Sequence, residues 1–398
     1  MCFYDIIHIT NLVEIYMKKD NDAQNLGRLD SLDVLRGFDM FFITGGAAMI
    51  VGLCAALNCC PWLAQQMRHV DWQGLAHHDT IFPLFLFLAG VSWPFSLSSQ
   101  LKRNRSVLQI HLKLFQRVIT LFLLGLSFGG IMMFRPDFRL MSVLGFIGLA
   151  WGVAALIYLH VKKNSIRIIS IFALLTAYWA LLRFFHAPDA SQELLLGPLG
   201  SFAKETNIVT WFDRMVYPNH LMVKVGKGFL YEPESLFAVT NGAAHALIGM
   251  MAGTLLKSTS ITPSKKALSL FLCSVGALLL GAFFTYVLGD VVVKALWTSS
   301  FVLYAASYSF FMLALFYFVI DVKGWSKWGV LFRSIGRNSI LVYLMNMTGV
   351  TGSISRWIFK GVHANAGQWR QFAVHLTFFI AAWAVLAYLD KKKVYLKV

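Results

Sequence analysis

Apolar stretches, each about as long as a membrane-spanning helix, recur along the chain from residue 34 to residue 389. A transmembrane helix needs about 20 mostly apolar residues. Hydrophobic residues make up 58% of the chain and charged residues only 14%, whereas an ordinary soluble domain has about 25% charged residues. The pattern predicts an all-α, polytopic transmembrane bundle of about ten spans, and it excludes disordered chains, disulfide scaffolds and nearly all soluble enzymes. The predicted spans are Val34–Ala56, Ile81–Ser99, Ile110–Ile131, Met141–His160, Ile166–Leu182, Ser235–Leu256, Ala267–Leu288, Val291–Ile320, Ile335–Val350 and Phe372–Leu389.

The basic residues predict how this bundle is oriented. Lys and Arg number 35 against 19 Asp and Glu, a net charge of +16, and no nucleic-acid-binding motif accompanies them. We therefore expect contacts with anionic lipid and no nucleic-acid partner. Basic residues collect in alternate loops, which by the positive-inside rule predicts that both termini are cytoplasmic. The basic loops hold Lys102, Arg103, Arg105 and Lys113, then Lys162, Lys163 and Arg167, then Lys257, Lys265 and Lys266, then Lys323, Lys327 and Arg333; the intervening short loops have only Arg68, and Arg135 with Arg139.

This orientation divides the chain into three parts. We expect a cytoplasmic N-terminal segment over residues 1–32, a single transmembrane domain over residues 33–390 and a basic cytoplasmic tail over residues 391–398. Two extracytoplasmic loops, near residues 57–79 and 183–234, are longer than a simple connection requires. Residues 1–16 are too short to span a membrane and do not have the pattern of a signal peptide.

The densest set of chemically useful side chains precedes the second predicted span. Residues 67–79 contain three histidines and two aspartates, namely His69, His77, His78, Asp71 and Asp79. A histidine can accept a proton near neutral pH, and a nearby carboxylate can orient it. The alternative is an ordinary solvated loop. Because adjacent His77 and His78 cannot easily face one ion, and no cysteine set has metal-ligand spacing, we expect no metal.

Polar side chains also occur within or beside the predicted spans, where ionisable groups are costly. Each one has an alternative role, because Asn, Ser and His also hold membrane helices together, and acidic residues before a helix can cap it. The candidates are Asp39, Arg117, Glu232, Glu234, Asn241, His245, Arg337, Asn338 and Asn346.

Four blocks, taken in order, resemble the heparan-α-glucosaminide N-acetyltransferase family. The first block is the basic entry to the first span, Arg28 to Met40, with Asp33, Arg36 and Asp39. The second contains His69, Trp72, Gly74 and Asp79 and continues through Ile81 to Ser92. The third is Tyr231 to Leu236 with Gly249 and Gly253, and the fourth is Ile335 to Tyr343. The blocks extend from about residue 28 to about residue 345 and so cover most of the chain.

The resemblance implies an enzyme that takes the acetyl group of cytoplasmic acetyl-CoA and transfers it to an amino sugar, a terminal glucosamine in the family, on the other side of the membrane. It implies that His69 is the catalytic histidine, acting as a base or as an acetyl carrier, with Asp79 holding its imidazole. The acceptor would contact Asp39, Asp71, Trp72, Gln73, Glu232 and Glu234, and the acetyl-CoA would contact Arg36, Arg103, Arg105, Arg337, Asn338 and Ser339.

The chain departs from the family pattern at three places. Ala47 occupies the part of the first span where the family commonly has Asn or Asp, Gln73 stands for an Asn, and Glu232-Pro233-Glu234-Ser235 replaces Asp-Pro-Glu-Gly. Two alternatives stay open: a secondary transporter of a small polar solute, and an acyltransferase with another donor or a hydroxyl acceptor. We expect a bacterial inner-membrane location, and a homodimer is compatible with the sequence.

Overall fold

The computed structural model describes residues 29–131, 138–225 and 229–396. Arg28 and Arg135, and most of the expected N-terminal segment, lie outside these ranges. Within them, nine helices are long and apolar enough to cross a membrane, which confirms an all-α, polytopic integral membrane protein. The chain forms two compact units: Met1–Met67 with Leu315–Val398, and Arg68–Ala314.

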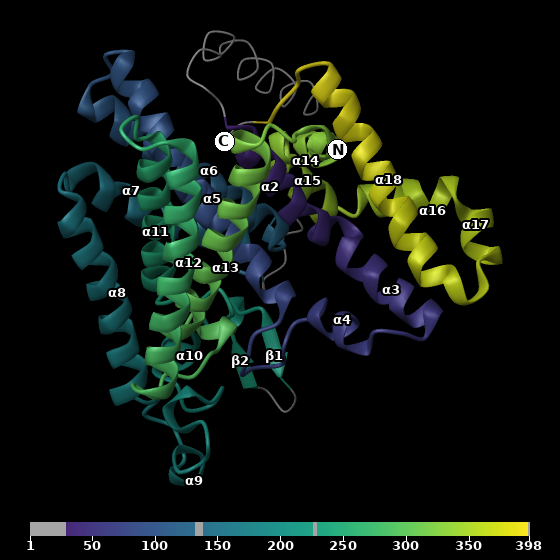
Figure 1. Cartoon of the computed structure of the whole chain (residues 1–398). Helices are drawn as coiled ribbons and strands as arrows, with labels where there is room; N and C mark the ends of the chain where they lie inside the picture. The colour runs from purple at the N-terminus through teal and green to yellow at the C-terminus, as the bar shows by residue number, and fades with distance from the viewer. Residues whose placement is uncertain (1–28, 132–137, 226–228, 397–398) are drawn as a thin grey trace. The chain divides into compact units, whose positions relative to one another are not determined.

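The unit of residues 68–314 is a helical bundle with a small β-hairpin at one end (Figure 1). Helix α11 is its centre and packs against α5, α7, α8 and α12. In the apolar part of α11, 78% of the residues are buried inside the protein. In the apolar part of α6 only 17% of the residues are buried, so α6 exposes the apolar surface expected of a helix beside lipid. The elements are α5 (His77–Lys102), α6 (Val107–Phe128), α7 (Val143–His160), α8 (Asn164–Phe184), α9 (Gln192–Leu195), α10 (Ile208–Val216), β1 (Val223–Val225), β2 (Phe229–Tyr231), α11 (Val239–Lys257), α12 (Pro263–Tyr286) and α13 (Ser299–Phe316).

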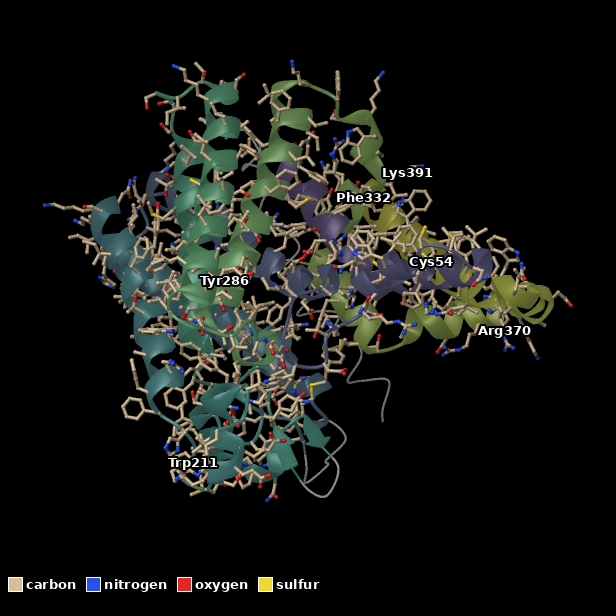
Figure 2. The ribbon with its side chains drawn as sticks, turned by 60° about the horizontal axis from the view of Figure 1, so that its bottom comes forward. Cys54, Trp211, Tyr286, Phe332, Arg370 and Lys391 are labelled. Carbon is tan, nitrogen blue, oxygen red and sulfur yellow. The ribbon has the colours of Figure 1, made fainter. Side chains whose placement is uncertain are left out.

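Glycines allow α5 and α11 to approach closely. A Cβ atom on Gly90 would lie 2.3 Å from the carbonyl oxygen of Ala246, and one on Gly249 would lie 2.3 Å from that of Phe87. Small residues at membrane helix interfaces permit such backbone contact. On the outer side of the bundle, large apolar side chains are exposed; Tyr286 at the end of α12, labelled in Figure 2, is 83% exposed.

Helix α5 has chemically different ends. Its 26 residues make it about 39 Å long. The His77 end joins the histidine-rich loop. At the Lys102 end, Arg105 donates to Gln100 over 3.4 Å and the Lys257 ammonium donates to the hydroxyl of Ser98. One helix therefore separates the histidine cluster from a set of basic side chains.

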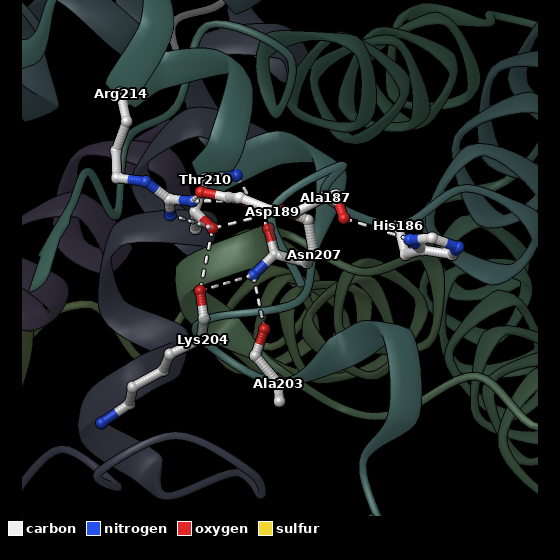
Figure 3. Close-up of polar contacts among 8 residues, drawn as sticks. All are labelled: His186, Ala187, Asp189, Ala203, Lys204, Asn207, Thr210 and Arg214. Carbon is white, nitrogen blue, oxygen red and sulfur yellow. Dashed lines mark hydrogen bonds and ion pairs between the residues drawn. The ribbon is translucent and has the colours of Figure 1, made fainter. Parts of the chain in front are cut away.

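The predicted long loop over residues 183–234 is folded in its described parts, residues 183–225 and 229–234. Asn207 caps α10 by accepting the Thr210 amide over 2.8 Å, and its own amide group donates to Ala203 O over 2.7 Å. Arg214 pairs with Asp189 over 3.1 Å (Figure 3). With α9, α10 and the paired strands β1 and β2, the described residues of this segment lie at the His77 end of the unit.

The other unit contains a bent first span and the C-terminal helices. The bend lies at residues 42–46, where Gly45 has a φ of 102° that favours glycine. Ion pairs join its helices: Arg333 lies 3.2 Å from Asp30, and Arg337 lies 3.1 Å from Asp390. Its elements are α2 (Asp30–Phe41), α3 (Ala47–Leu57), α4 (Pro61–Gln66), α14 (Val330–Arg337), α15 (Ser339–Met347), α16 (Val350–Ile358), α17 (Lys360–Asn365) and α18 (Arg370–Lys391).

Two predicted spans differ from the observed helices. The stretch Ile335–Val350 is not one helix, because Asn338 interrupts it between α14 and α15 with ψ at 32°. The Asn338 side chain instead binds the C-terminal backbone, donating to Val394 O and accepting the Leu396 amide, each over 3.0 Å. The predicted span Val291–Ile320 begins later, since α13 starts at Ser299.

Candidate active site

The histidine-rich loop brings His69 to the carboxylate of Asp79. The Nδ1 atom of His69 lies 2.7 Å from Asp79 Oδ1. Asp79 is in the first turn of α5, with its side chain fully buried, whereas 55% of the His69 side chain is exposed. The second oxygen of Asp79 accepts the backbone amide of Ala76 over 3.1 Å. The carboxylate is therefore fixed by the helix start, and the imidazole it holds faces outward.

Lys294 completes this group from a segment far along the chain. Its ammonium lies 2.9 Å from His69 Nδ1 and 3.2 Å from Asp79 Oδ1. The backbone positions it, because the Gly74 amide donates to Val292 O over 2.9 Å and Gln73 pairs with Val293 in an antiparallel bridge. Lys294 was not among the site residues expected from the sequence, although a lysine within an apolar stretch is itself a signal of function.

The two histidines that begin α5 lie beside this group. The ring centroid of His78 is 4.4 Å from that of His69. His77 turns instead toward α13, and its Nε2 atom lies 2.9 Å from the Tyr308 hydroxyl. Among the described residues no group of three or more His, Cys, Asp or Glu side chains is arranged to hold a metal ion.

The geometry gives His69 a usable nitrogen. In the tautomer with the proton on Nδ1, His69 donates to Asp79 Oδ1 and the lone pair is on Nε2. This is the arrangement of a general base or nucleophile oriented by a carboxylate.

The three candidate acceptor residues near His69 in sequence differ in exposure. Asp71 and Gln73 are exposed. Trp72 is only 8% exposed; its indole donates to Phe202 O over 3.0 Å, and its ring meets that of Tyr231 edge-on with centroids 5.5 Å apart. The surroundings of the Trp72 ring are therefore mainly protein.

Glu232 and Glu234 meet Arg139, a partner that the sequence did not indicate. Arg139 Nε donates to Glu232 over 3.0 Å, and its terminal nitrogen contacts both carboxylates. Burial raises the pKa of Glu232 to about 8 against the opposing effect of Arg139, and Glu234 adds to the rise. The two glutamates thus join the start of α11 to the segment before α7.

The candidate donor-binding residues fall into both units. Arg103 and Arg105 follow α5 at the end opposite His77. Arg36, Arg337, Asn338 and Ser339 are in the other unit, where Arg36 pairs with Asp33 over 3.4 Å. Asp39, a candidate acceptor residue, also lies in that unit and is 1% exposed. Although partial burial lowers the pKa of Arg337, the carboxylates of Asp390 and Asp33 raise it overall. Arg36 and Arg337 therefore already have acidic partners within the protein.

The sequence of this chain is similar to the sequences of known proteins. A family profile described as "Heparan-alpha-glucosaminide N-acetyltransferase, catalytic" matches residues 28–212, which include His69 and Asp79. The chain is similar in sequence to the heparan-alpha-glucosaminide N-acetyltransferases. The resemblance expected from the four sequence blocks is confirmed.

Two relatives named heparan-alpha-glucosaminide N-acetyltransferase, from Homo sapiens and Mus musculus, are each 27% identical to the chain. The alignments cover 93% and 95% of this chain but 60% and 62% of the respective relatives. The chain thus spans about three fifths of the length of these heparan-alpha-glucosaminide N-acetyltransferases.

Proposed function

We propose that the protein is a transmembrane acetyltransferase that moves an acetyl group from cytoplasmic acetyl-CoA to the amino group of an extracytoplasmic, glucosamine-like sugar. The observation that carries the proposal is the 2.7 Å contact between His69 Nδ1 and the buried carboxylate of Asp79. The names of the relatives support the same reaction class.

The chemistry requires a group such as His69. An amine attacks a thioester only when it is unprotonated, so the reaction needs a base that works near neutral pH. In the direct route, the amine nitrogen bonds to the acetyl carbon, the C–S bond of acetyl-CoA breaks, and His69 Nε2 takes the proton lost by the amine. In the carrier route, Nε2 bonds to the acetyl carbon and the C–S bond breaks, so that CoA leaves as the thiolate. The amine then attacks the same carbon, the bond to Nε2 breaks, and Nε2 takes the proton lost by the amine. The Asp79 contact serves both routes.

The two ends of α5 suit the two substrates. A helix of about 39 Å exceeds the about 30 Å hydrocarbon core of a bilayer, so its ends can face different compartments. Arg103 and Arg105 at one end are suited to bind the phosphates of CoA. Asp71, Gln73 and the exposed His69 ring at the other end are available to a sugar.

The remaining parts of the proposal concern the whole chain. The termini, with residues 1–32 and 391–398, would face the cytoplasm of a bacterial inner membrane, and residues 33–390 would form the transmembrane enzyme, as a monomer or a homodimer. Asp39, Trp72, Glu232 and Glu234 would support acceptor binding, and Arg36, Arg337, Asn338 and Ser339 would support donor binding.

Contacts within the bundle favour this proposal over a transporter. The buried His245 contacts Pro83 O through Nε2 over 3.0 Å, Asn241 donates to Trp297 O over 2.8 Å, and the Arg117 guanidinium lies 4.2 Å from the centroid of a Trp151 ring. These polar groups hold helices together, which is a common role of such residues in membranes.

The test is acetyl transfer across proteoliposomes, with labelled acetyl-CoA on one face and glucosamine on the other. We expect transfer by the native chain and a loss of at least about 100-fold in His69→Ala, the lower range for removal of a general base. His186→Ala is the matched control, since His186 is an exposed histidine in the 183–234 segment and its loss should leave the rate unchanged.

The outcomes separate the alternatives. Equal rates for the native chain and His69→Ala would overturn the assignment of His69. Transfer to a hydroxyl sugar but not to glucosamine would replace the amine acceptor with a hydroxyl acceptor. Uptake of free glucosamine without acetylation would support the transporter.

A further inference from the structure

We propose that His111 and His160 form a binding site for a divalent transition-metal ion that joins helix α6 to helix α7. The site goes beyond the proposed acetyl transfer and lies outside the histidine-rich loop, for which the sequence predicts no metal. His111 is in the second turn of α6, and His160 is the last residue of α7. The Nε2 atoms of the two rings are 3.0 Å apart.

The hydrogen bonds of this histidine pair define the nitrogen that each ring can offer to a metal. His111 Nδ1 lies 2.8 Å from the carbonyl oxygen of Val107. Because a carbonyl oxygen only accepts, Nδ1 carries the proton, and the lone pair of the neutral ring is on Nε2, the atom that faces His160. Without a metal, the N–H group at Nε2 of His160 donates to this lone pair. When the proton of His160 is on Nδ1 instead, two lone pairs face one ion.

The distance between the two nitrogens suits a shared metal ion. A bond between zinc and an imidazole nitrogen is about 2.0–2.1 Å long, so two nitrogens bonded to one zinc ion at the tetrahedral angle are about 3.3–3.4 Å apart. The observed separation of 3.0 Å is only a few tenths of an ångström shorter. A small side-chain rotation opens the pair by that amount.

The packing of α6 against α7 holds the two rings opposite one another. A Cβ atom on Gly152 would lie 2.6 Å from Val118 Cγ2, and one on Gly148 would lie 3.1 Å from Leu121 Cβ. The helices therefore run antiparallel in close contact. The histidine pair lies about two turns further along the same line of contacts, toward the start of α6 and the end of α7.

The end of α7 is also fixed by Arg167. The guanidinium donates to Tyr158 O over 2.7 Å and to Val161 O over 2.6 Å, so it binds the last carbonyl groups on both sides of His160. Arg167 is itself only 8% exposed. Both ligands are thus held in place before a metal arrives, and preorganised ligands lose less conformational entropy on binding.

The donor atoms select the class of metal. Imidazole nitrogens suit Zn²⁺, Cu²⁺ and Ni²⁺, whereas Mg²⁺ and Ca²⁺ prefer oxygen ligands. His160 is exposed and His111 is partly exposed, so water can supply the remaining ligands. Because α7 is the main packing partner of α6, a metal bound here would tie the start of the more exposed helix to the bundle.

The test measures zinc binding at each histidine separately. Diethyl pyrocarbonate modifies accessible imidazole lone pairs, and a bound metal protects them. Mass spectrometry of peptides from the full chain in detergent at pH 7.5 gives the labelling rates of His111 and His160 as the zinc concentration rises. We expect both rates to fall in parallel, with one common midpoint at micromolar zinc. Mg²⁺ at the same concentrations should protect neither histidine.

Two reciprocal variants show whether the histidines share one ion. In His160→Ala, the zinc concentration that half-protects His111 should rise at least about tenfold, since even the loss of a group that only supports a ligand costs about 10–100-fold in metal affinity. His111→Ala should have the same effect on His160, and it serves if the first variant does not fold. His186→Ala is the matched control, because it removes an exposed histidine of the 183–234 segment and should leave both midpoints unchanged.

The outcomes separate a shared site from binding by single histidines. An unchanged midpoint for the remaining histidine in either folded variant would overturn the site, because each ring would then bind zinc alone. Protection of the native chain only at millimolar zinc would indicate an adventitious ion only and would overturn the site as well. The measurement does not use acetyl transfer, so a shared site in a chain that transfers no acetyl group would refute the acetyltransferase proposal alone.

Discussion

At the scale of single residues, Asp290 shows how the loop before α13 is held. The carboxylate is 1% exposed and accepts the Ser300 amide over 2.7 Å. Burial raises the pKa of Asp290 from the ordinary 3.8 to about 6, although hydrogen bonds from Ser300 and the Ser299 backbone oppose the rise. This contact joins the start of α13 to the segment that contains Lys294.

Asp290 predicts a specific dependence of stability on pH. Because its folded-state pKa exceeds the unfolded value, the folded state binds the proton more tightly between pH 4 and pH 6. Its contribution is fully present below about pH 4 and is lost as the pH rises through about 6, at a cost of about 1–3 kcal/mol. Asp290→Asn keeps an acceptor for Ser300 and should reduce this dependence, as measured by thermal unfolding in detergent at pH 4.5 and pH 7.5.

The control for this prediction is Asp189→Asn, which removes a carboxylate that is 60% exposed beside Arg214. That variant should retain the pH dependence of the native chain, because exposed ion pairs contribute little. An Asp290→Asn variant with an unchanged dependence on pH would show that other groups control it.

Single residues also show which contacts of the candidate site could be predicted from the sequence. His69 and Asp79 are ten positions apart and belong to one motif, so their pairing could be predicted. Lys294 and Arg139 could not, because they reach their acidic partners across long separations, 93 residues for Arg139 and Glu232. Local sequence patterns carry no information about which distant loops meet at one end of a bundle.

At the scale of elements, the α5–α11 contact depends on glycine. A methyl group on Gly249 would press on the Phe87 carbonyl oxygen at 2.3 Å. We expect Gly249→Ala to destabilise the protein by about 1–3 kcal/mol and to lower its unfolding temperature in detergent.

Gly276→Ala is the matched control, since nothing lies within 4 Å of a Cβ atom placed on this α12 glycine. It should leave stability unchanged or raise it by about 0.5 kcal/mol. Similar losses in both variants would mean that the loss does not come from the close contact between α5 and α11.

Helix boundaries were predictable where hydrophobicity alone sets them. The spans now seen as α6, α7, α8 and α12 follow their apolar stretches to within a few residues. The prediction was wrong at Ile335–Val350, because the tertiary contact between Asn338 and the C-terminal backbone decides that break. The start of α13 was also misplaced, since residues 291–298 are apolar yet form a loop packed beside Trp72.

At the scale of the whole molecule, the orientation of the chain is testable from the unit of residues 68–314. Lys265 is at the start of α12, next to the end of α11, and Asp189 is in the 183–234 segment. With the five native cysteines replaced by serine, we expect Asp189→Cys to react with an impermeant maleimide from outside intact cells. Lys265→Cys should react only after permeabilisation.

Labelling of both cysteines from the same side would contradict a bundle in which α5 separates donor from acceptor. If Lys265→Cys reacted from outside and Asp189→Cys only after permeabilisation, α5 would still separate donor from acceptor, but acetyl transfer would run in the opposite direction. Full reaction of both positions after permeabilisation is the control for accessibility.

The length of α5 also has a consequence for the environment of its histidine end. The helix is longer than the hydrocarbon core by about 9 Å, and a moderate tilt absorbs only part of this mismatch. The end that contains His77, His78 and Asp79 is therefore expected among the lipid headgroups.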